Sequence, residues 1–206
     1  MKKGTLWILL GLLLIGAALT LTIYNFSESD RAEGDSAEIV EELVNQLEEI
    51  VDGKEEDATA ETTPEYILFP EKEMPTIKIG NERYIGYIEI PGLRLKLPVA
   101  AGEWTMAKLE KAPCHISGTP YLGNLVIAGH DYRSHFGNLP TLKIGSEIIF
   151  TDAEGNVFEY EIGWTEVIKG NDGASMVSGD EEWDLTLYTC TWSGRDRYTV
   201  RCYENR

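Results

Sequence analysis

The chain has 206 residues, 43% of them hydrophobic, which is enough for one folded domain with additional segments. Its formal net charge of −17 argues against a nucleic-acid partner, because such binding depends on positive side chains that displace counterions from phosphates. Its three cysteines are too few for a disulfide scaffold, and none of them has the spacing of a zinc site.

The first predicted element is a membrane anchor, residues 1–26. An uncharged stretch of 19 residues, 5–23, follows Lys2 and Lys3, and the next charge is Glu28. This length matches the roughly 20 residues that cross a bilayer. A cleaved signal peptide is the alternative, but its apolar core spans only about 7–15 residues. Lysines before the span and acids after it predict a cytoplasmic amino terminus and an extracellular remainder.

Residues 27–75 form a predicted acidic stalk. Between positions 28 and 73 there are 17 acidic residues against three basic ones, a composition that buries little apolar surface. Apolar residues at three- and four-residue spacing predict one amphipathic helix within it, with Ser36 as N-cap and Gly53 as stop. This helix either rests on the following domain or self-associates as a short coiled coil. Its apolar positions are Ile39, Val40, Leu43, Val44, Leu47, Ile50 and Val51.

Residues 76–206 form the predicted folded domain. Apolar residues alternate with polar ones in several segments, which is typical of half-buried strands, and short apolar runs suit central strands. We expect a mostly antiparallel barrel or sandwich with short helices, such as one at 105–111, and a hairpin turn at 152–156. The predicted strands are 93–99, 125–128, 148–150, 158–162, 185–190 and 197–203.

Three residues in this domain are candidates for catalysis. Cys190 ends a predicted strand beside a loop, where a thiol can meet a substrate. His130 comes where the apolar strand 125–128 emerges, and it could act as the base that a cysteine nucleophile needs. Arg197 opens the strand after the loop, so a hairpin would bring it close to Cys190, where it could stabilise an oxyanion.

These residues lie in segments that resemble the sortase family. The family's TLxTC motif is matched by Thr186-Leu187-Tyr188-Thr189-Cys190, its histidine segment by Gly129-His130, and its arginine strand by Arg195-Asp196-Arg197-Tyr198-Thr199-Val200. The histidine lies 60 residues before the cysteine, and the arginine lies seven after it. The resemblance covers residues 76–206, and the predicted anchor agrees with it.

The resemblance implies a fold and an activity. The expected fold is mostly β, a closed eight-stranded β-barrel with short helices, on the outer face of a Gram-positive membrane. The expected enzyme is a cysteine transpeptidase that cleaves an LPxTG-like sorting signal of surface proteins between Thr and Gly. It would hold the product as a thioacyl enzyme and pass it to an amine of a cell-wall precursor or a pilin.

By the same resemblance, Cys190 is the nucleophile, His130 the general acid and base, and Arg197 the oxyanion or substrate-positioning group. Thr189 would shape the substrate pocket. We expect no cofactor and no metal ligand; the acidic loops match no EF-hand spacing, and the sequence leaves the use of calcium open. Residues 128–140 and the short span to Cys190 resemble class D more than class B, while the lack of a second apolar segment after Arg206 disfavours class C.

The residues also leave structural alternatives. Cys114 and Cys202 are expected to be buried hydrophobes, with Cys202 facing away from Arg197. Arg195 is a rival to Arg197, because loop boundaries read from sequence are uncertain by two or more positions. Asp131 could orient His130 or be a solvated loop charge. The other histidines, His115 and His135, are rivals to His130 in polar, loop-like segments.

Two other functions compete with a transpeptidase. A papain-like cysteine hydrolase has its cysteine before its histidine and near a helix start, whereas here His130 comes first and Cys190 follows a strand. An extracytoplasmic hydrolase that uses only water remains a further alternative. A non-catalytic surface module would use its cysteines only for structure, and it would then show no reactive thiol.

Overall fold

The barrel is closed by an antiparallel pairing between strand β2 and strand β6, which lies at the far end of the sheet order. In the computed structural model, which describes residues 3–57, 63–177 and 183–205, nine strands follow the order β1-β2-β3-β4-β5-β8-β9-β7-β6. A further pairing of β2 with β6 closes eight of them, and β1 extends the sheet outside the ring. The strands are β1 Ile77–Ile79, β2 Glu82–Ile90, β3 Leu95–Ala100, β4 Cys114–Ser117, β5 Leu125–Ala128, β6 Glu147–Asp152, β7 Val157–Lys169, β8 Leu185–Cys190 and β9 Asp196–Glu204.

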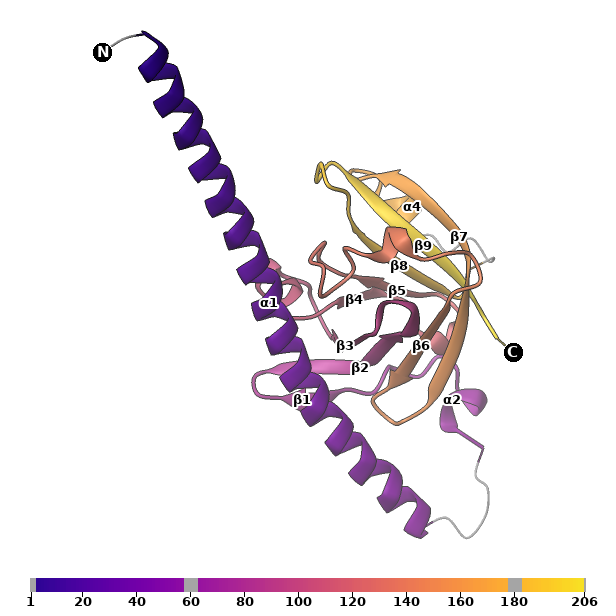
Figure 1. The fold of residues 1–206 in the computed structure, drawn as a ribbon. Coiled ribbons are helices and arrows are strands. Elements are labelled where there is room, and N and C mark those ends of the chain that lie inside the picture. The colour runs from indigo at the N-terminus through magenta and orange to yellow at the C-terminus, as the bar shows by residue number, and fades with distance from the viewer. Residues whose placement is uncertain (1–2, 58–62, 178–182, 206) are drawn as a thin grey trace.

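The predicted fold class is therefore confirmed. Among the described strands, β3 with β4 and β5 with β8 pair in parallel, and the other neighbours are antiparallel. Helices are few and mostly short, and a long α1 lies alongside the barrel (Figure 1). The helical elements are α1 Lys3–Asp57, α2 Glu65–Leu68, η1 Pro91–Leu93, α3 Met106–Leu109, η2 Pro120–Leu122, η3 Leu139–Thr141 and α4 Gly173–Val177.

Closure depends on a glycine in β2. Gly86 pairs with Val99 of β3 on one side and with Asp152 of β6 on the other, at a point where the β2 register shifts. Its φ is 141°, and a Cβ there would lie 1.9 Å from the carbonyl oxygen of Thr151. Only glycine lets the two backbones approach so closely while β2 bends between partners.

The barrel interior is filled by large apolar side chains from every wall. Alternation along β7 buries Phe158, Tyr160 and Ile162 and exposes the glutamates between them, as the period-two pattern predicts. One predicted strand begins late. Leu93 lies in the turn η1 and Arg94 takes a left-handed conformation with φ 56°, so β3 starts at Leu95.

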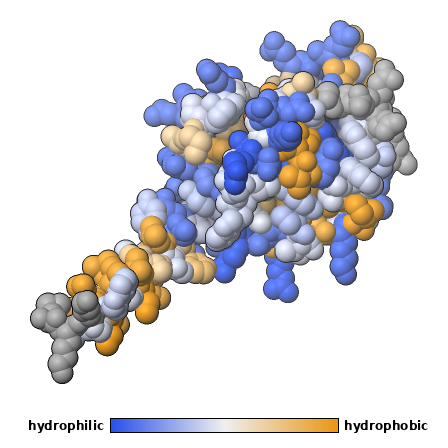
Figure 2. Space-filling model, turned by 90° about the horizontal axis from the view of Figure 1, so that it is seen from above, coloured by the Kyte–Doolittle hydropathy of each residue, from blue (hydrophilic) through white to orange (hydrophobic). Residues whose placement is uncertain are grey.

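Helix α1 runs without interruption through the predicted anchor and into the predicted stalk. A helix starting at Ser36 and stopping at Gly53 is therefore wrong, because both residues lie inside α1. Extending an existing helix adds one hydrogen bond per residue and needs no new nucleus. The apolar first part projects beyond the barrel, where Figure 2 shows hydrophobic side chains around the protruding end. By length and composition this part can cross a membrane, and none of its most apolar window is buried.

The second half of α1 packs on the barrel, so of the two expected arrangements the helix rests on the domain. Leu43 and Leu47 lie in a small apolar cluster against Ile77, Tyr84 and Cys114. The buried positions of the helix recur every three or four residues and form one face. They are Ser29, Ala32, Ser36, Val40, Leu43 and Leu47.

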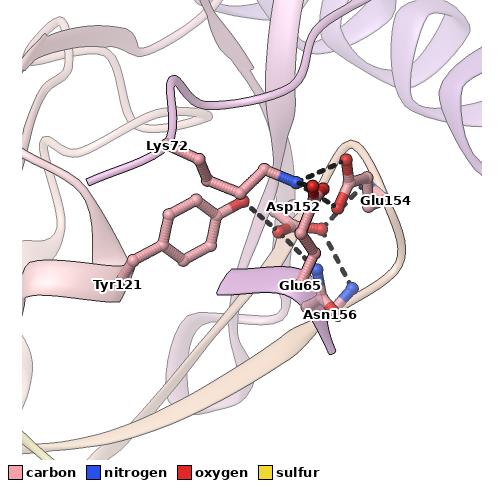
Figure 3. A network of polar contacts seen from close by, with 6 residues as sticks. All are labelled: Glu65, Lys72, Tyr121, Asp152, Glu154 and Asn156. Atoms are coloured by element: carbon pink, nitrogen blue, oxygen red, sulfur yellow. Dashed lines mark hydrogen bonds and ion pairs between the residues drawn. The ribbon is translucent and has the colours of Figure 1, made fainter. Parts of the chain in front are cut away.

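Residues 65–72 also contact the barrel, at the end where β6 turns into β7. Tyr66 stacks on Tyr121, with ring centroids 5.0 Å apart. Figure 3 shows Lys72 between Glu65 and Glu154, with nitrogen-to-oxygen distances of 2.7 and 3.0 Å. The little burial that the acidic composition predicts is confirmed, since none of residues 63–75 is fully buried, and aromatic stacking and paired charges supply the contacts with the barrel.

A buried carboxylate organises the same turn. Asp152 is fully buried and accepts hydrogen bonds from the hydroxyl of Tyr121 at 2.7 Å, the Asn156 side chain at 2.8 Å, and the backbone N–H groups of Glu154 and Asn156 (Figure 3). Four donors satisfy both carboxylate oxygens, which offsets the cost of burying the charge. The hairpin turn predicted from residues 152–156 is confirmed.

Candidate active site

The hairpin of β8 and β9 aligns two of the three candidate residues. Cys190, the last residue of β8, is the direct partner of Arg197 in the antiparallel register. Directly opposed residues project from the same face of a hairpin, so both side chains lie on one side of it. The Cys190 side chain is half-buried, and the loop 191–195 that connects the strands is largely exposed.

The third candidate residue follows the neighbouring parallel strand, β5. Ala128 of β5 pairs with Tyr188 of β8, and the Gly129 N–H donates to the Tyr188 carbonyl at 3.0 Å. His130 lies two residues past the end of β5 and Cys190 is the last residue of β8, so both lie at the same end of these two parallel strands. The structure thus brings Cys190, His130 and Arg197 to adjoining strand ends.

A tight loop after β5 holds His130. The Phe136 N–H donates to the carbonyl of His130 at 3.0 Å, which closes the loop on itself. A Cβ at Gly129 would lie 2.4 Å from the Phe136 ring, so glycine is needed where the fully buried ring packs under the chain.

Two neighbours contact the imidazole of His130. Its Nδ1 lies 2.8 Å from Oδ1 of Asp131, but the atoms are not aligned for a hydrogen bond, so the contact is electrostatic. That contact lowers the pKa of Asp131, with a smaller contribution from the charge of Arg197. The Tyr132 ring stacks on the imidazole at a centroid distance of 3.8 Å. Asp131 is therefore more than a solvated charge, and nothing in the sequence pattern indicated Tyr132.

Arg197, and not Arg195, faces the cysteine. The Arg197 guanidinium donates from Nη1 to the carbonyls of Gly194 and Asp196, both at 3.1 Å, which holds it at the base of the loop. The side chain of Arg195 is exposed, while its carbonyl accepts from the Gly170 N–H at 3.0 Å. A guanidinium held this way still has N–H groups that can reach a substrate oxygen.

Thr189 is placed apart from this group. Successive side chains of a strand alternate in direction, so Thr189 points to the opposite face of β8 from Cys190. It is only 2% exposed, and its Oγ1 is buried with no hydrogen-bond partner among the described residues.

The other two histidines and the other two cysteines lie in the sheet or in the protein interior. His115 lies in β4, not in a loop, with Nε2 2.8 Å from the Gly118 carbonyl. His135 is fully buried, which its polar sequence neighbourhood did not predict. Cys114 and Cys202 are buried as expected. Burial raises the pKa of Cys114 to about 11 and that of Cys202 further, which keeps both thiols protonated.

A pocket of about 680 Å³ opens between this site and helix α1. His130, Asp131 and Tyr132 line one side, Trp192 of the exposed loop contributes to the rim, and residues 22–29 of α1 supply much of the rest. Within the described part of the chain, no group of three His, Cys, Asp or Glu side chains could hold a metal ion.

Comparison with known proteins identifies a family and several solved structures with a similar fold. A family model of the sortase domain matches residues 88–205. A Clostridium perfringens sortase D5 transpeptidase has 23% sequence identity and a TM-score of 0.59, covering 84% of this chain and 99% of that chain. Streptococcus pneumoniae sortase C has 17% identity and a TM-score of 0.60, covering 82% and 97%. A lid mutant of Corynebacterium diphtheriae sortase A has 22% identity and a TM-score of 0.56, covering 83% and 96%.

No curated protein sequence matches the chain significantly. At these identities the structural neighbours show a shared fold, and members of classes A, C and D match it about equally well.

Proposed function

We propose that this chain, which belongs to the sortase family, cleaves an LPxTG-like sorting signal and transfers the acyl product to an amine. Membership of the family supports a cysteine transpeptidase in general terms. The observation that carries the assignment of residues is the cross-strand pair of Cys190 and Arg197, with His130 in the loop that follows the adjoining parallel strand.

In the first half-reaction the Cys190 sulfur attacks the carbonyl carbon of the Thr–Gly bond. The carbonyl oxygen becomes an oxyanion, and the Arg197 guanidinium on the same hairpin face stabilises it by donated hydrogen bonds. His130 takes the proton of the Cys190 thiol as the sulfur attacks and gives it to the departing glycine amine as the C–N bond breaks, which leaves a thioacyl group on Cys190.

In the second half-reaction an amine attacks the thioacyl carbon. His130 takes a proton from that amine and returns it to the sulfur, which leaves as the new amide forms. A bound amine has the advantage of proximity over bulk water, so transfer competes with hydrolysis. Asp131 beside Nδ1 and Tyr132 stacked on the ring support the imidazole in the orientation that both steps need.

We also propose the division of the chain into an anchor at 1–26, a connecting segment at 27–75 and a catalytic domain at 76–206. The apolar start of α1 supports membrane attachment, and the charges flanking it support a cytoplasmic amino terminus with the barrel outside. The partners are then surface proteins that carry the sorting signal and an amine of a cell-wall precursor or a pilin. Assignment to class D remains part of this proposal.

The papain-like alternative is disfavoured because Cys190 ends a β-strand and does not begin a helix. The other two alternatives, a hydrolase that uses only water and a non-catalytic module, are distinguished by the experiment described next.

The test is incubation of the full chain, in detergent, with a panel of LPxTG-like peptides, with and without added amines. Mass spectrometry should find a thioacyl adduct on Cys190 with the peptide alone, and a ligated product with peptide and amine. Cys190→Ala should form no adduct, and His130→Ala should be severely slowed in forming it. Release of peptide by water alone, unaffected by any amine, would indicate a hydrolase, and the absence of any adduct would indicate a non-catalytic module.

A further inference from the structure

Helix α1 contacts the catalytic-histidine loop, residues 130–137, through a buried polar interface. The packed face of α1 is divided along its length. Val40, Leu43 and Leu47 supply apolar packing at one end, whereas Ser29 and Ser36 face the loop at the other. Serines are small and polar, and apolar periodicity therefore does not register them as part of a packed face.

Ser36 links the loop to the barrel wall. Its hydroxyl donates to the carbonyl of Lys111, just before β4, at 2.6 Å, and lies 3.0 Å from Nε2 of His135. The single hydroxyl proton goes to Lys111, so the imidazole must donate its Nε2–H to the serine oxygen. Both side chains are almost completely buried, and water cannot replace either partner.

A second contact fixes the preceding residue of the loop. The Ser134 hydroxyl donates to the carbonyl of Ser29 at 2.8 Å, and both side chains are buried. The two serines of α1 thus hold two consecutive residues of the loop, Ser134 and His135.

Displacement of these two residues would be transmitted to His130 by the backbone. The N–H groups of His135 and Gly137 both donate to the Tyr132 carbonyl, at 3.0 and 2.9 Å, and the Phe136 N–H donates to the His130 carbonyl. The loop therefore behaves as one closed unit, and its attachment at positions 134 and 135 determines where the imidazole lies.

We propose that Ser36 and His135 are positioning residues for catalysis, through which the anchor helix holds the His130 loop in its reactive place. This inference rests on the proposed role of His130. It makes α1 a functional part of the catalytic unit in addition to a tether.

The test is a double-mutant cycle in the full chain, with Ser36→Ala, His135→Ala and both changes together. Loss of either partner leaves a buried polar group unsatisfied and reduces the fraction of molecules with a competent loop, so kcat should fall about 10-fold with little change in the KM for peptide. The double variant should lose little more than either single one, because the two residues act through one contact.

Val40→Ala is the matched control. Val40 lies one helical turn from Ser36, is buried on the same face and has no polar side-chain atom, so truncating it should lower the melting temperature and leave kcat within about two-fold at temperatures well below melting. Equal losses of kcat in Val40→Ala and Ser36→Ala, or additive losses in the double variant, would overturn the proposal.

Hydrogen exchange without substrate separates this proposal from the proposed function. Ser36→Ala should increase exchange of the amides of 130–137 about 10-fold more than Val40→Ala does. If wild-type chain formed no thioacyl adduct while this increase were seen, the enzymatic assignment would fail and the structural link would stand. Unchanged exchange in an active enzyme would refute the link alone.

Discussion

Cys190 and Arg197 are direct partners across the hairpin of β8 and β9, and the guanidinium of Arg197 is held by the carbonyls of Gly194 and Asp196. The pairing puts a positive, planar hydrogen-bond donor on the same hairpin face as the thiol. The strand register and the two carbonyls fix the direction of the guanidinium. We therefore expect its planar shape to matter as much as its positive charge.

Replacement of Arg197 by lysine should remove most activity although the charge is retained. Lysine cannot give the two directed hydrogen bonds of a guanidinium, and loss of an oxyanion donor costs about 10²–10³ in rate. Steady-state kinetics with peptide and amine measure the effect, and Arg195→Ala is the control. Near wild-type turnover in Arg197→Lys, together with an inactive Arg195→Ala, would reverse the choice between the two arginines.

Two truncations should differ sharply in stability. Removal of residues 1–27 leaves the packed face of α1 intact, and the remaining chain should be soluble, folded and active. Removal of residues 1–57 also deletes Leu43 and Leu47, whose burial contributes about 3–6 kcal/mol. The melting temperature should then fall by about 10 °C or more. Thermal unfolding followed by circular dichroism compares the two, and equal melting temperatures would show that α1 adds nothing to the domain.

Stability should decrease as the pH falls from about 6.5 to 4. Burial, with a smaller effect from nearby His130, lowers the pKa of His135 from 6.5 to about 4. In this window the unfolded chain binds a proton that the folded chain excludes, so the free energy of unfolding rises with pH. The contribution of His135 is complete above its unfolded pKa and amounts to about 3 kcal/mol across the window.

Urea unfolding at several pH values measures this slope. His135→Gln should be less stable at neutral pH and should show a flatter dependence between pH 4 and 6.5. An equally steep dependence in His135→Gln would assign the effect to other groups.

Replacement of Asp152 by alanine should destabilise the fold without impairing the site. Four hydrogen bonds to a buried carboxylate are lost, and their donors are left unsatisfied, at a cost of about 3 kcal/mol. β7 runs from this turn to the Arg197 end of the barrel, so the two sites lie at opposite ends of a 13-residue strand. Chemical unfolding should show the loss, and kcat of the folded enzyme should be unchanged. A large decrease in kcat would indicate coupling along the barrel.

The sequence by itself determined the features that depend on local pattern. Period-two alternation predicted β7 and β9, the apolar run 125–128 predicted β5, and a hairpin of 185–190 with 197–203 predicted that Cys190 and Arg197 would meet. These predictions succeeded because the alternation of a strand and the reversal of a hairpin are properties of neighbouring residues.

Only the tertiary structure decided what surrounds His130. Tyr132 stacks on the imidazole within the loop 130–137, and the contact of the buried His135 with Ser36, 99 residues earlier in the chain, depends on α1 crossing the barrel beside this loop. Ser36 had the sequence pattern of a helix cap, since a serine before an apolar repeat satisfies that local rule. Its hydroxyl instead serves a long-range contact, because its neighbours are set by how two distant segments pack and not by residue spacing.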